Sequence, residues 1–441
     1  MLRQVLASAE YADGRTPVLF LDPPDRTLYK MQKPISLTFP VPGLALSRRD
    51  CLVASLGAAA ASTFPARGQS HVRNVSWLAE VQSPSMEGQT PLSSALKRED
   101  GTLVRSLDAW RQRRDEIRRS WLDYLGPLPQ NPNPPRLKFI TEKPASNGTG
   151  PIQSPPGVIR ELVEYESEPG LSVRGYLIKP KKLSGKAPGI VVLHATTHNT
   201  IRQSAGVEGK NQLALGLKLA QQGFVTFSPA CFLWEAIAGG NLPSSCQEQH
   251  RGNQADAHGF KPPSSWVRHA WEVRVHQFQV RHPNSTGMAK MLFDAQRGLD
   301  VLEQVEEVDN DRLGAFGHSL GAKESFYLSA FDERVRAAIS SEPGIGAHFS
   351  NWYASWYLGP GIKQFGHDHQ EVMALIAPRP FLLLAGEGTD GVKSSPFIRA
   401  AMPAYRLYGD PTRLGLLNHG HGHSVPPSVE LRINEWFKTY L

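Results

Sequence analysis

A serine between two glycines stands at residues 317–321, where the sequence reads Gly-His-Ser-Leu-Gly. The pattern before it, Arg312–Phe316, predicts a strand, and Ala322–Phe331 after it favours a helix. In such a strand–turn–helix the serine occupies a strained turn that lifts its hydroxyl above the sheet, and the glycines let strand and helix approach closely. The spacing therefore predicts that Ser319 is a nucleophile.

A serine hydroxyl is a weak nucleophile, so it needs a base, and the base needs an orienting acid. Histidines 419, 421 and 423 alternate with glycines near the C-terminus. His423 stands just before the closing helix, where a base would hang over the nucleophile, so we predict that it is the base. His419 and His421 are expected to be loop residues. The tract could hold a divalent cation, but no partner cluster of ligands is evident and no metal is expected.

Two carboxylates follow predicted strands at positions from which they could reach His423. Asp390 comes after the strand at 380–385, and Glu342 comes after the preceding strand, which ends at residue 340. Glu387 is a weaker candidate that we expect to cap the turn. Because Thr-Asp-Gly is a favoured turn sequence, Asp390 could instead be a turn residue.

An oxyanion formed during acyl transfer needs two backbone N–H donors. We expect one from Leu320, directly after the nucleophile, as is usual in a turn of this type. The other is expected from Thr196, in the loop after the first long strand, although this loop could also be an ordinary turn.

Strands and helices alternate from Ala187 onward, which predicts an α/β fold with a mostly parallel sheet and helices on both faces. Two stretches interrupt this alternation: residues 230–284, the first excursion, and residues 343–376, the second excursion. The expected organisation is an N-terminal extension (1–70), a helical extension and linker (71–155), and a catalytic domain (156–441).

Loops at the carboxyl ends of the strands form the crevice of such sheets, so the excursions should contact the substrate. The second excursion carries Trp352, Tyr353, Trp356 and Tyr357. Aromatic faces stack on sugar rings, and Trp352 and Trp356 are the candidate platforms. The alternative is that these rings pack the excursion onto the body of the domain.

The chain resembles the dienelactone-hydrolase and acetylxylan-esterase branch of the α/β-hydrolases, which is related to the catalytic domain of prolyl oligopeptidases. The matching stretches are 194–197, 311–322, 377–383 and 422–427, within residues 155–441. The resemblance implies a cofactor-free hydrolase of carboxylic esters, some members acting on plant polysaccharide esters. It also places the acid in the loop of Asp390, which is therefore preferred over Glu342. Ala195 departs from the pattern, since such chains often carry glycine there.

The first hypothesis is thus an ester hydrolase acting on a small-molecule or carbohydrate ester. A prolyl-oligopeptidase-like peptidase is the second, but such enzymes carry a propeller of about 40–50 residues per blade, for which the helical extension is too short. A catalytically silent binding module on the same fold is the third. The complete set of serine, acid and histidine argues against it.

The composition excludes few classes of protein function, because 40% apolar and 20% charged residues are ordinary for a soluble globular protein. The net charge of +7 is dispersed. The one dense basic stretch, residues 111–119, alternates with acids at helical spacing and is typical of an amphipathic helix, so no nucleic-acid partner is expected. Of the three cysteines, Cys231 and Cys246 could pair or remain free thiols.

Residues 47–66 contain a twin arginine, an alanine-rich apolar run and small residues. This resembles a bacterial twin-arginine export signal, with Cys51 where phenylalanine is usual. The apolar run is shorter than the roughly 20 residues that span a bilayer. We therefore expect an exported, periplasmic or extracellular protein without a stable membrane span. The alternative is an N-terminal extension with two incidental arginines.

Overall fold

The computed structural model describes residues 74–142, 153–197, 199–234 and 265–441. The described residues belong to one compact unit, so the described parts of the helical extension and of the catalytic domain pack as a single body. The predicted export signal, Cys246 and residues 235–264 of the first excursion lie outside the described residues.

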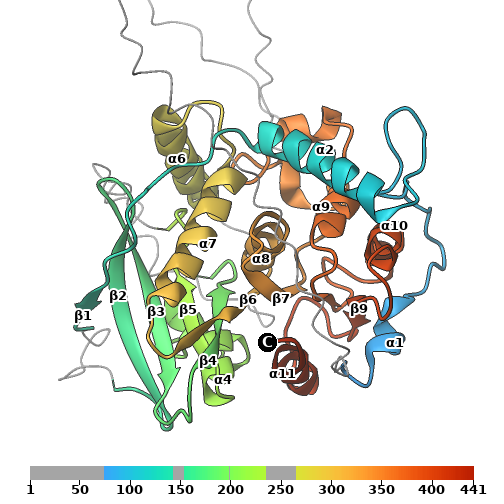
Figure 1. Ribbon diagram of the computed structural model, residues 1–441. Helices are drawn as coiled ribbons and strands as arrows, with labels where there is room; N and C mark the ends of the chain where they lie inside the picture. The colour runs from blue at the N-terminus through green and yellow to red at the C-terminus, as the bar shows by residue number, and fades with distance from the viewer. Residues whose placement is uncertain (1–73, 143–152, 198, 235–264) are drawn as a thin grey trace, which may run out of the picture. The chain divides into compact units, whose positions relative to one another are not determined.

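Nine strands of the described chain form one sheet in the order β1-β2-β3-β5-β4-β6-β7-β8-β9 (Figure 1). The pairs from β5 through β4 to β9 are parallel, whereas β1, β2 and β3 pair antiparallel at one edge. The predicted mostly parallel sheet is confirmed. The strands are β1 (Lys138–Ile140), β2 (Val158–Glu168), β3 (Leu171–Pro180), β4 (Ala187–Leu193), β5 (Val225–Pro229), β6 (Val308–His318), β7 (Val335–Ser341), β8 (Phe381–Ala385) and β9 (Leu414–Asn418).

Helices cover both faces of this sheet, with α7 and α8 on one side and α4 and α11 on the other (Figure 1). The helices are α1 (Leu78–Gln82), α2 (Leu107–Leu125), α3 (Thr200–Ser204), α4 (Leu215–Gln221), α6 (Ser265–Arg281), α7 (Gly287–Glu303), α8 (Leu320–Phe331), α9 (His369–Leu375), α10 (Ser395–Arg406) and α11 (Pro427–Tyr440). Short 3-10 turns span Asn211–Leu213, Asn351–Tyr353, Pro360–Gln364 and Val392–Ser394.

The continuous apolar run of β4 reflects burial on both of its faces. Val191 and Leu193 pack into one hydrophobic cluster, and Ile190 and Val192 pack into the other. A parallel strand covered by helices on both sides has no solvated face, so every side chain along it is apolar. The parallel pairing of β4 with β6 sets Leu193 at the end of β4 opposite Gly317.

The amphipathic helix expected around residues 111–119 is α2, which buries Trp110, Ile117 and Trp121. Its basic side chains are not all solvated. Arg113 is buried and its guanidinium lies 2.9 Å from the carboxylate of Glu371 in α9. The basic stretch thus helps to anchor α2 to the body. No helix among the described residues combines the length and apolar character needed to cross a membrane.

Candidate active site

Ser319 occupies the turn between β6 and α8 with φ 60° and ψ −114°, a conformation that side-chain-bearing residues rarely adopt. The flanking glycines are required sterically. A Cβ at Gly317 would lie 2.0 Å from the carbonyl oxygen of Gly321, and a Cβ at Gly321 would lie 2.1 Å from that of Leu193. Only glycine lets strand, helix and the end of β4 meet this closely.

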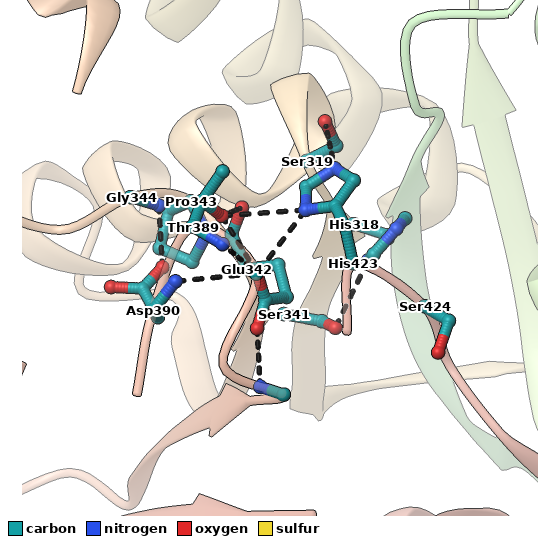
Figure 2. Close-up of polar contacts among 12 residues, drawn as sticks. His318, Ser319, Ser341, Glu342, Pro343, Gly344, Thr389, Asp390, His423 and Ser424 are labelled. Atoms are coloured by element: carbon teal, nitrogen blue, oxygen red, sulfur yellow. Dashed lines mark hydrogen bonds and ion pairs between the residues drawn. The ribbon is translucent and has the colours of Figure 1, made fainter. Parts of the chain in front are cut away.

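His423 lies in the loop between β9 and α11, with its ring over the serine (Figure 2). Its Nε2 is 2.8 Å from the Ser319 Oγ. His419 and His421 stack on one another instead, with ring centroids 5.8 Å apart. In the part of the chain that the structure describes, no group of three or more His, Cys, Asp or Glu residues is arranged to hold a metal ion.

Glu342, the first residue after β7, is the carboxylate that faces the histidine. Its Oε2 lies 3.2 Å from the Nδ1 of His423 (Figure 2). The same oxygen accepts the backbone N–H of Thr389 at 2.5 Å and the Thr389 hydroxyl at 2.8 Å, and Oε1 accepts the N–H of Gly386. Burial raises the pKa of Glu342, but the hydrogen bonds from His423 and Thr389 outweigh it and lower the pKa to about 2. Glu342 is therefore ionised and can orient the imidazole.

The sequence favours Asp390 as the acid, but the structure directs its carboxylate to other partners. Its buried carboxylate accepts the N–H of Gly344 at 2.5 Å, the N–H of Ile345 at 2.8 Å and the hydroxyl of Ser394 at 2.6 Å. Burial raises its pKa. Asp390 therefore points away from His423, and the alternative carboxylate, Glu342, stands at the imidazole (Figure 2).

The geometry of the loop after β8 explains why Glu342, and not Asp390, faces His423. This loop crosses the end of β7, and its backbone N–H groups at Gly386 and Thr389 donate to the Glu342 carboxylate. The backbone of the loop, and not the Asp390 carboxylate, therefore lies next to the Glu342–His423 pair. The Asp390 N–H itself donates to Glu342 Oε2 at 3.2 Å. Glu387 accepts the N–H of Val392 at 3.1 Å, which is the turn-capping role expected for it.

The predicted oxyanion donors come from two segments that lie in contact. Leu320 is the first residue of α8, so its N–H has no carbonyl partner within the helix. The loop carrying Thr196 directly follows β4, whose last carbonyl packs against Gly321. The assignment of both N–H groups to an oxyanion remains a proposal.

Trp352 and Trp356 are not sugar platforms in this structure, which favours the packing alternative. Trp352 is fully buried and its Nε1–H donates to the Gly344 carbonyl at 2.6 Å. Trp356 is 9% exposed and packs edge-on against Trp271 at 5.3 Å. Of the four aromatic residues in this group, Tyr353 is the exposed one, at 49%.

Lys323 was missed on sequence, although a cation inside the apolar pattern of Ala322–Phe331 is a usable signal. Its buried ammonium donates to the Pro343 carbonyl at 2.5 Å and lies 3.8 Å from the Trp352 ring centroid. Burial lowers its pKa to about 7. Lys323 thereby anchors the residue that directly follows Glu342. Thr389, which also contacts Glu342, had no distinguishing sequence signal.

Residues 173–348 match the model of the dienelactone hydrolase family, a span that contains Ser319 and Glu342. A glucuronoyl esterase from Solibacter usitatus superposes with a TM-score of 0.52 at 17% identity, covering 81% of this chain and 98% of that one. The protein has the α/β-hydrolase fold. The predicted resemblance to the dienelactone-hydrolase and acetylxylan-esterase branch is confirmed.

Two other similar proteins are named for carbohydrate esters. A candidate acetyl xylan esterase from Bacteroides fragilis superposes with a TM-score of 0.51 at 14% identity, covering 78% of this chain and 91% of that one. A 4-O-methyl-glucuronoyl methylesterase of Phanerochaete carnosa is 27% identical over 188 residues, which are 34% of this chain and 46% of that protein. The chain spans about a third to a half of the length of the curated relatives that it matches.

Proposed function

We propose that this protein is a serine hydrolase of carboxylic esters. The observation that carries the proposal is the unbroken contact chain from the Ser319 Oγ through His423 to the buried, ionised Glu342. The three groups follow β6, β9 and β7, so the carboxyl edge of a parallel sheet assembles them.

In the proposed reaction Glu342 keeps the proton of His423 on Nδ1, which leaves Nε2 free to accept the serine proton. The Ser319 Oγ then attacks the ester carbonyl, and the N–H groups of Leu320 and Thr196 stabilise the oxyanion. Collapse of the tetrahedral intermediate breaks the ester bond, and His423 gives its proton to the departing alcohol. Water, activated by the same histidine, then hydrolyses the acyl-enzyme to the acid and regenerates Ser319. All of these steps use protein groups and water.

We further propose that the substrate is an esterified carbohydrate and that the protein is exported. The named activities of the similar proteins support the first part, and the twin-arginine pattern at 47–66 supports the second. Fractionation of bacterial cells that express the whole chain tests export, which a purely cytoplasmic product would exclude.

The activity is tested with p-nitrophenyl acetate and with a panel of acetylated xylo-oligosaccharides, feruloylated sugars, methyl glucuronate and simple lactones. We expect turnover that Ser319→Ala abolishes, and a higher kcat/KM on at least one sugar ester than on p-nitrophenyl acetate. A proline-containing peptide anilide serves as the control for the peptidase alternative. Hydrolysis of the anilide alone, or equal rates for wild type and Ser319→Ala, would overturn the proposal.

A further inference from the structure

His194, the residue directly after β4, is a buried histidine for which the proposed reaction has no role. Burial lowers its pKa to about 4, so the imidazole is neutral under ordinary assay conditions. The ring also packs edge-on against Trp234, with centroids 5.1 Å apart. A neutral, enclosed imidazole neither carries charge nor exchanges protons with the substrate, so its function must lie in its hydrogen bonds.

The two ring nitrogens of His194 have different partners, which identifies the tautomer. The backbone N–H of Cys231 donates to Nε2 at 3.1 Å, so Nε2 is the unprotonated nitrogen. The proton is therefore on Nδ1, which lies 2.9 Å from the carbonyl oxygen of Ala195. The Cys231 backbone thus makes His194 a hydrogen-bond donor to Ala195.

The Ala195 carbonyl belongs to the same planar peptide unit as the Thr196 N–H. In a trans peptide these two groups point in opposite directions, so a bond that fixes the carbonyl also fixes the N–H. Without the Nδ1–H donor the peptide could rotate and present an oxygen where the oxyanion needs a donor. His194, Ala195 and His318 line one small pocket, so this loop lies beside the nucleophile strand.

We infer that His194 is a positioning residue that holds the Ala195–Thr196 peptide with the Thr196 N–H directed at the oxyanion. The inference rests on the proposed function, because it assigns that N–H to the tetrahedral intermediate. His194 acts through the peptide bond and does not touch the substrate.

Two substitutions of similar size separate this role from packing. In His194→Asn the amide NH₂ replaces Nδ1 and can donate to the Ala195 carbonyl, but the acceptor for Cys231 is lost. In His194→Gln the longer side chain can accept the Cys231 N–H, but the donor to Ala195 is lost. Both variants are compared with wild type and Ser319→Ala for kcat and KM on p-nitrophenyl acetate, for Tm, and for binding of a trifluoromethyl ketone, which forms a tetrahedral adduct with the serine.

We expect His194→Gln to lower kcat by about 10- to 100-fold, less than or equal to the loss of one oxyanion donor, with little change in KM. Its affinity for the ketone should fall in parallel, because the adduct carries the oxyanion. His194→Asn should keep a kcat close to wild type. Equal losses in both variants, or losses that follow Tm, would overturn the inference while the Ser319-dependent activity stands. Absence of that activity in wild type would instead overturn the proposed function, and the inference with it.

Discussion

The loops after β7 and β8 each carry a buried carboxylate, and the two carboxylates behave in opposite ways. Glu342 has one oxygen on the imidazole and a pKa lowered to about 2, whereas Asp390 has both oxygens on donors of the loops and a raised pKa. Both are essentially inaccessible to solvent, so burial alone does not separate them. What separates them is their partners: Glu342 accepts from the His423 imidazole and from Thr389, whereas Asp390 meets no imidazole.

This comparison shows that the two carboxylates have complementary positions. Glu342 faces His423, and Asp390 holds the segment that follows Glu342. Asp390 accepts the N–H groups of Gly344 and Ile345, and Lys323 donates to the carbonyl of Pro343. These are the residues that follow Glu342, whose backbone has φ 58° and must be held in place. The loop after β8 therefore supports the loop that carries Glu342.

The largest expected effect is on the kcat of Glu342→Gln, which should fall by about 10³- to 10⁴-fold while KM changes little. The amide cannot accept from every donor that now meets the carboxylate, and an NH₂ turned toward His423 would favour the wrong imidazole tautomer. Asp390→Asn measured alongside should lose less than about tenfold, because its side chain meets no reacting group. The reverse ranking would return the role of acid to Asp390.

A second effect is on the pH dependence of stability. The folded-state pKa of Glu342 is lowered from 4.5 to about 2, so its contribution is present above pH 4.5 and is lost as the pH falls toward 2. Relative to Glu342→Gln, wild type should therefore lose up to roughly 3 kcal/mol of unfolding free energy over this window. Asp390 has a raised folded-state pKa, so relative to Asp390→Asn wild type should lose stability as the pH rises above 3.8.

These differences are measured by urea unfolding at several pH values between 2 and 6, with the two variants as references for wild type. Opposite signs are expected for the two positions. The same sign at both would show that the two carboxylates sit in equivalent environments, and the comparison would fail.

The smallest effect is on the unfolding free energy of Asp390→Asn at neutral pH, which should fall by about 1–2 kcal/mol. The cause is a buried hydrogen-bond donor that faces another donor. The amide can still accept from Ile345 or Ser394, but its NH₂ would oppose the N–H of Gly344. Chemical denaturation at pH 7 measures it, with Ser319→Ala as a control expected to match wild type. A variant as stable as wild type would mean that Asp390 does not brace this segment.

The sequence by itself determined the local and repetitive features of this protein. The strand, the glycine-flanked Ser319 and the helix after it are adjacent in the chain, so their geometry follows from short-range sterics. The alternation of apolar strands with helices predicted the parallel sheet. The place of His423 just before the last helix predicted that its ring lies over the serine. Each of these depends on neighbours in the chain or on a periodicity that the residues themselves carry.

Only the tertiary structure decided which carboxylate meets His423 and which aromatic residues are exposed. Glu342 and Asp390 lie 48 positions apart and both follow strands that end at the same edge, so the chain order serine, acid, histidine fits either. The choice depends on how one loop crosses the other. Trp352 was equally ambiguous, because an aromatic ring suits a sugar-binding surface and a core alike, and its burial over Lys323 arises from packing between segments far apart in the sequence.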